Sequence, residues 1–126
     1  MGERLWSRLD GGVNADYIGS FDIAEGGQIV RAIRYSGESQ LGGDAWRANG
    51  MADVAISVLD SSGTPIQTTS MGSVGDEVFP QVVAHRDRVT VALQTYGITV
   101  DYWLDNTMTG RGNGDVHVLD VALDTQ

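Results

Sequence analysis

The sequence predicts an all-β protein: an antiparallel β-sandwich of about eight strands, jelly-roll-like, with an N-terminal arm. Apolar and polar residues alternate with a period of two along most of the chain, as in strands that bury one face. Turn-forming residues separate these stretches about every 8–12 residues, which is the spacing of short strands in a sandwich or barrel. No stretch shows the apolar spacing of a long helix.

The stretch 89–104 carries the clearest alternation. Its apolar residues stand at odd positions up to Leu93 and at even positions from Ile98 onward. Because strand side chains alternate between faces, a shift of one residue would turn the second set to the wrong side. We therefore expect a chain reversal or a glycine bulge at Tyr96-Gly97 that returns both sets to one buried face.

The first element is an arm, residues 1–16, followed by a single domain, residues 17–126. Leu5, Trp6 and Leu9 have the spacing of one helical turn, which Gly11-Gly12 would end. A helix this short is marginal on its own. Two interpretations follow: either the arm docks on its own domain, or Trp6 inserts into a neighbouring subunit.

The domain then divides into strands at its turn residues. Asp60-Ser61-Ser62-Gly63 predicts a hairpin turn, since Asp commonly opens such turns and Gly accepts a positive φ. Residues 36–52 form a long connection, and 106–115 a polar loop with regularly spaced glycines. The predicted strands are 17–23, 29–35, 53–60, 65–70, 78–84, the two halves of 89–104, and 116–123.

The predicted core consists of the apolar residues on the inward phase of these strands. They are Ile29, Ile33, Val54, Ile56, Val58, Val89, Val91, Leu93, Val100 and Tyr102.

The composition excludes several classes of function. A chain of 126 residues with a net charge of −9 has the size of one domain and lacks the clustered cations that bind nucleic acid. The absence of cysteine excludes disulfides, cysteine-ligated metals and a cysteine nucleophile. No apolar run approaches the roughly 20 residues of a membrane span, and no secretory signal is expected at the start.

The residues with catalytic or metal-binding chemistry form no recognisable motif. The two histidines, His85 and His117, stand beside no nucleophile motif, and the loop 109–115 lacks the lysine of a P-loop. Asp101, Asp105 and Asp115 are weak candidates for a calcium site or a carboxylate pair, but aspartates at strand ends are usually turn formers. We expect no enzymatic activity, no cofactor and no metal.

Several residues outside the alternating core pattern belong to types enriched at protein interfaces. Trp103 takes the polar phase of its strand, so it lies either on an exposed face or under a covering layer; both remain open. Trp46, Tyr102 and Trp103 also suit stacking on sugar rings. The predicted interface residues are Leu5, Trp6, Arg8, Leu9, Leu41, Trp46, Arg47 and Trp103.

The small acidic chain without cysteine, with its arm, short strands and glycine-rich excursion, resembles the accessory virion proteins of tailed bacteriophages, particularly head decoration (cement) proteins. That resemblance implies a non-enzymatic structural protein that binds capsid or other virion proteins, often as a trimer, and that is assembled into the virion in the host cytoplasm. The stretch 53–63 also resembles jelly-roll modules of secreted enzymes. A carbohydrate-binding or other recognition module is therefore the alternative.

Overall fold

The computed structural model describes residues 2–48, 51–72, 77–96, 99–102, 106–109 and 114–123. These residues form strands and turns without a helix, and all strand pairs are antiparallel, which confirms the all-β, antiparallel prediction. The strands are β1 (Gly11–Gly12), β2 (Tyr17–Ile23), β3 (Ile29–Tyr35), β4 (Glu38–Leu41), β5 (Asp44–Arg47), β6 (Asp53–Leu59), β7 (Pro65–Met71), β8 (Glu77–His85), β9 (Arg88–Thr95), β10 (Thr99–Tyr102), β11 (Asn106–Thr109) and β12 (Asp115–Ala122).

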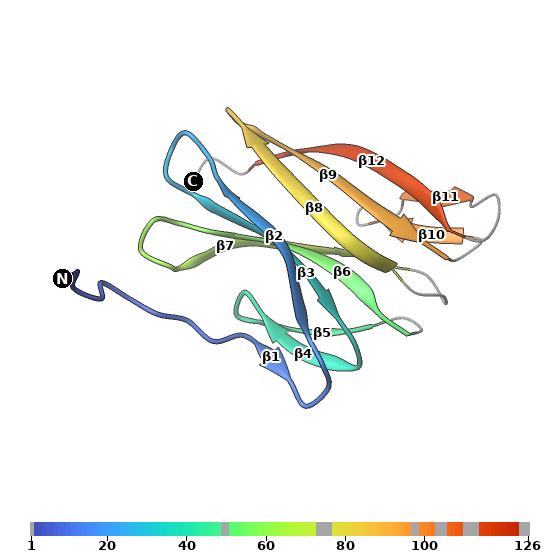
Figure 1. Cartoon of the computed structure of the whole chain (residues 1–126), viewed down its shortest axis with the longest axis horizontal. Helices are drawn as coiled ribbons and strands as arrows, with labels where there is room; N and C mark the ends of the chain where they lie inside the picture. The colour runs from blue at the N-terminus through green and yellow to red at the C-terminus, as the bar shows by residue number, and fades with distance from the viewer. Residues whose placement is uncertain are drawn as a thin grey trace.

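Within each of the two larger sheets, the strands lie side by side in the order in which they occur along the chain. One has the order β2-β3-β6-β7 and the other β12-β9-β8, while β1-β4-β5 and β10-β11 form two smaller sheets. Figure 1 shows the larger sheets as two layers. The prediction of about eight strands in a jelly-roll-like sandwich is not confirmed in that form, because the described strands number twelve and neighbours within each larger sheet run up and down without a Greek-key crossover.

The main core lies between the two larger sheets. Val30 and Ile56 reach it from the four-stranded sheet, and Val91 and Leu93 from the three-stranded sheet. The buried residues here confirm six predicted core positions: Val54, Ile56, Val58, Val89, Val91 and Leu93. The strand that contains Val100 and Tyr102 is described, but their side chains are not, so the burial of these two residues stays a prediction.

The four-stranded sheet is covered on its other face as well. Every residue of β6 is buried, because small residues such as Ala55 on this second face leave room for a covering layer. Ile33, Tyr35, Leu41 and Ala55 form a second cluster there. Two predictions are corrected: Ile33 belongs to this second cluster rather than to the main core, and Ile29 on the same face is only half-buried.

The covering layer comes from residues 36–52, which were expected to be a loop. Instead β4 and β5 pair as a hairpin with Leu41 opposite Asp44. The two central residues, Gly42 and Gly43, have φ of 60° and 84°, which is the geometry of the tight turn that favours two glycines. The side chains of Trp46 and Ala48 then pack on the second cluster.

The two halves of the stretch 89–104 belong to different sheets. The expected return of both apolar sets to one buried face stays a prediction, because the side chains of the second half lie outside the described residues. β9 pairs with β8 and β12, whereas β10 pairs with β11 in a separate two-stranded sheet. The two halves therefore do not lie side by side in one sheet, and Gly97 itself lies outside the described residues. Part of the expected loop 106–115 is strand, because β11 begins at Asn106.

The turn after β6 is confirmed. The Gly63 amide donates to the Asp60 carbonyl at 3.0 Å, and Gly63 has a φ of 87°. Asp60 Oδ1 accepts hydrogen bonds from the amides of Ser62 and Thr64, each at 2.9 Å. The Ser62 hydroxyl, followed by the Thr64 amide, lowers the pKa of Asp60 by stabilising its charged form.

The arm docks on its own domain and takes no helical form. Trp6 Nε1 donates to the Ser61 carbonyl at 3.1 Å, and the indole lies against Gly63, where an added Cβ would come within 2.6 Å of the ring. Asp10 Oδ2 accepts hydrogen bonds from Arg8 at 2.9 Å and from Arg31 of β3 at 2.8 Å. The arm is thus held to the turn after β6 and to the second face of the four-stranded sheet.

Candidate functional site

The two larger sheets meet where β2 crosses β8. Gly19 of β2 lies so close to Pro80 that an added Cβ would come within 2.1 Å of the Pro80 carbonyl oxygen. Both strands are irregular there, with register shifts between Ile18 and Ser20 and between Val78 and Gln81. The same two irregular segments line a hollow at the mouth between the sheets, and bulges of this kind commonly bend a strand.

On the other side of the crossing, side chains of β2 cap the edge of β8. The Val82 amide donates to Ser20 Oγ at 2.7 Å, and the Ala84 amide donates to Asp22 Oδ2 at 2.8 Å. The Ala84 amide, then the Ile23 amide, lowers the pKa of Asp22 by favouring its carboxylate form. These bonds satisfy donors that a sheet edge otherwise exposes.

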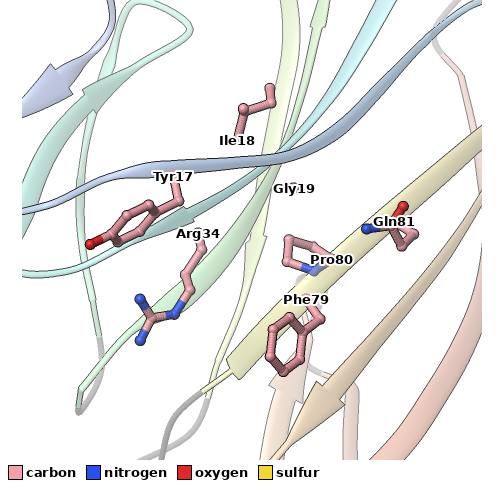
Figure 2. Close-up of a pocket in the computed structure, with 7 residues that line it drawn as sticks. All are labelled: Tyr17, Ile18, Gly19, Arg34, Phe79, Pro80 and Gln81. Atoms are coloured by element: carbon pink, nitrogen blue, oxygen red, sulfur yellow. The ribbon is translucent and has the colours of Figure 1, made fainter.

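The mouth contains a hollow of about 420 Å³. Figure 2 shows Tyr17 and Arg34 on one side of it, with Phe79 and Pro80 across from them on β8. The Arg34 guanidinium lies 5.7 Å from the centre of the Tyr17 ring, within the range of a cation–π contact. The residues lining the hollow are Tyr17, Ile18, Gly19, Arg34, Phe79, Pro80 and Gln81.

Phe79 holds an uncommon backbone conformation. Its φ is 56°, a region that a bulky residue adopts only at a cost of about 1–3 kcal/mol. Phe79 is also largely exposed, with 70% of its surface accessible. Backbone strain of this kind is concentrated at binding sites, so Phe79 marks the mouth as a candidate site.

The outer side of β2 is also apolar and open. Ile18, Phe21 and Ile23 are each between 59% and 64% exposed, because β2 is an edge strand of its sheet and the covering hairpin packs on β3 and β6. Leu9 of the arm lines a smaller hollow with Ile18. Ile18, Phe21 and Ile23 stand opposite Ile33, Arg31 and Ile29 on the second face of the sheet, whereas Tyr17 and Phe79 of β8 lie at the hollow. We call these two adjoining groups, Ile18, Phe21 and Ile23 with Tyr17 and Phe79, the β2 surface.

The predicted interface residues of the arm have two different environments. Leu5 and Leu9 project into solvent, Leu9 with 97% of its surface exposed. Trp6 and Arg8 instead contact their own chain through Ser61 and Asp10.

The remaining predicted interface residues are dispersed. Leu41 is only 1% exposed, so its side chain belongs to the chain's own core and is corrected from an interface residue to a core residue. Trp46 is partly buried against that same cluster. Arg47 is exposed and lies 3.6 Å from Glu38. Trp103 lies outside the described residues.

The acidic candidates do not form a described site. Asp101 belongs to β10, Asp115 begins β12, and Asp105 lies outside the described residues. Within the described ranges, no group of three or more His, Cys, Asp or Glu residues could hold a metal ion. His117 is buried, with Nε2 3.2 Å from Thr95 Oγ1, while His85 lies at the exposed end of β8.

The sequence-based reasoning did not identify the β2 surface. Tyr17, Phe21 and Ile23 follow a regular alternation that predicts a strand, but alternation does not say whether either face is covered. Two features of the sequence could have indicated the crossing of β2 and β8: Gly19 inside a predicted strand and Pro80 directly after Phe79. A glycine or a proline within a strand is associated with bulges and with close approach of another backbone.

No protein family, characterised protein or solved structure matches this chain. The described part of the chain contains no helical segment with the length and hydropathy that crossing a bilayer requires.

Proposed function

We propose that this chain is a non-enzymatic structural protein that acts through protein–protein contacts, and that its assembly is the virion of a tailed phage, where it decorates and stabilises the capsid. The observation that carries the binding part of this proposal is the β2 surface. The assignment to a virion rests on the resemblance described above.

Two features of the β2 surface support a protein partner. Ile18, Phe21 and Ile23 are three large exposed apolar side chains on one face of β2, which favours an interaction site over ordinary solvent exposure. Tyr17 and Arg34 beside an apolar hollow are residue types that often dominate binding energy at protein interfaces. The exposed Leu5 and Leu9 of the arm extend the same kind of surface.

The proposal includes a scaffold and an assembly state. We infer that the two larger sheets act as the layers of a β-sandwich, related to jelly rolls in its layering, with the arm as an attachment device. The resemblance further implies a homo-oligomer, with a trimer favoured, that needs no cofactor.

The test is to look for the protein in purified particles of the phage that encodes it. We expect mass spectrometry to find it there in a fixed ratio to the capsid protein, and Phe21→Asp to reduce its binding to particles that lack it. Val83→Asp, which alters an exposed valine on the opposite sheet, is the matched control. Absence from the particles, or equal loss with both variants, contradicts the proposal.

A second candidate is the recognition of a carbohydrate in the hollow. Tyr17 and Phe79 place two aromatic rings around it, and such rings stack on sugar faces. A glycan array with the native chain and with Phe79→Ala separates the candidates. Glycan binding that Phe79→Ala abolishes favours recognition, whereas no glycan binding together with particle binding favours the structural role.

A further inference from the structure

The three-stranded sheet has two edges that the chain treats differently. At one edge, Ser20 and Asp22 accept the outward amides of Val82 and Ala84 in β8. At the other edge is β12, and no described strand pairs with its outer side. An uncapped edge presents a row of backbone donors and acceptors to another strand.

β12 is also the longest edge strand with a regular register among the described residues. The edge strands β2 and β8 each contain a bulge, and β7 begins with Pro65 and shifts register against β6. β5 has only four residues, with charged Asp44 and Arg47 at its ends. β12 instead keeps register with β9 over all eight residues and contains neither proline nor glycine. β12 carries the charged residues Asp115 and Asp120, but it lacks the bulge, the proline or the short length that protects these other edges.

The outer face of β12 is apolar and electrically neutral. Val116 and Val118 are 75% and 67% exposed. The charged residue on this face, Asp120, interacts with the neighbouring strand β9. Its carboxylate accepts a hydrogen bond from the Thr90 hydroxyl at 2.5 Å and lies 3.6 Å from the Arg88 guanidinium. In a chain with a net charge of −9, such a face allows a second copy to approach without strong repulsion.

We propose that β12 is a homodimerisation strand, which pairs antiparallel with β12 of a second copy about a two-fold axis. Centring the axis on His117 places Val116 of each copy opposite Val118 of the other, on the same exposed face. Asp120 then lies opposite Gly114 of the second copy, and no acid faces an acid. The three strands of each copy join into one continuous sheet.

This inference concerns a different surface from the β2 surface and does not rest on the assignment to a virion. It is an alternative to the trimer that the resemblance implies, because pairing of like strands about a two-fold axis closes at two copies.

The first experiment is sedimentation of the full chain from micromolar to millimolar concentration. We expect a dimer whose population rises with salt, because salt screens the repulsion between acidic copies. Val118→Lys should produce a monomer, while the matched control Val83→Lys, the same change at an exposed valine of β8, should leave the dimer intact. A monomer at all concentrations, a trimer, or equal effects of the two variants would overturn the proposal.

The second experiment tests the register and does not depend on a destabilising change. Because the chain has no cysteine, Val116→Cys and Val118→Cys introduce single thiols. An oxidised mixture of the two variants should give cross-linked dimer, whereas each alone should give much less, since only the mixture places two thiols opposite each other. Val83→Cys mixed with either is the control. Equal cross-linking in all combinations, or none in the mixture, contradicts the pairing.

Discussion

Gly19 and Pro80 are in backbone contact across the two larger sheets: a Cβ added to Gly19 would lie 2.1 Å from the Pro80 carbonyl oxygen. This contact fixes where β2 crosses β8. It also positions Ser20 and Asp22 to accept the amides of Val82 and Ala84.

Gly19→Ala should therefore destabilise the fold, because the added methyl meets backbone rather than a movable side chain. We expect a loss of about 1–3 kcal/mol in the free energy of unfolding, as for other overpacked contacts, measured by denaturant unfolding. Gly2→Ala is the control, since an added Cβ there meets nothing within 4 Å. Unchanged stability in Gly19→Ala would mean that the two strands are further apart than described.

Phe79→Gly should raise stability while it removes the aromatic ring from the mouth. Glycine adopts a φ of 56° without steric cost, so we expect a gain of up to about 1 kcal/mol in the free energy of unfolding. Arg86 has the same φ in the turn between β8 and β9, so Arg86→Gly should give a similar gain without affecting binding at the hollow. A clear loss of stability in Phe79→Gly would show that the ring itself holds the crossing together.

Asp10 should make stability depend on pH at the acid end. Burial raises the pKa of Asp10, but the hydrogen bonds from Arg8 and Arg31 lower it more, so the pKa lies below the ordinary value of 3.8. A carboxyl whose pKa falls on folding contributes its full stability above the unfolded pKa and loses it as the pH drops through the folded pKa. That window lies below about pH 4.

Asp10→Asn should cost roughly 1.5–3 kcal/mol at neutral pH, the usual size for hydrogen bonds to charged groups, and should flatten the loss of stability below about pH 4. Unfolding curves at several pH values measure both effects. Glu3→Gln, at an exposed position of the same arm, should leave both unchanged. If the Asp10→Asn curve parallels that of the native chain, the arm is not held by this carboxylate.

Ile56→Ala should test the shared core of the two larger sheets. Ile56 is buried among residues of both, so its truncation removes apolar contact and leaves a cavity, at a cost of about 2–5 kcal/mol in the free energy of unfolding. Ile23→Ala, an exposed isoleucine of β2, should change stability by only about 0.5 kcal/mol. Similar losses in both variants would contradict the assignment of the buried face.

The sequence by itself determined which residues form most strands and which of their phases is apolar. Val54, Ile56 and Val58 alternate in a strand and are buried as predicted, and Asp60 and Gly63 form the expected turn. These features depend on neighbours only a few residues apart. Period-two alternation and the conformational freedom of glycine act locally, so they can be read from the chain alone.

Only the tertiary structure decided which faces are covered and which strands meet. Phe21 is exposed while Ala55 is buried on the same face of the four-stranded sheet, because the β4-β5 hairpin covers β6 and not β2. Likewise, β10 pairs with β11 rather than with β9, and Phe79 meets Tyr17 across a gap of more than 60 residues to form the hollow. Burial and pairing depend on contacts between segments far apart in the chain, and local alternation carries no information about those contacts.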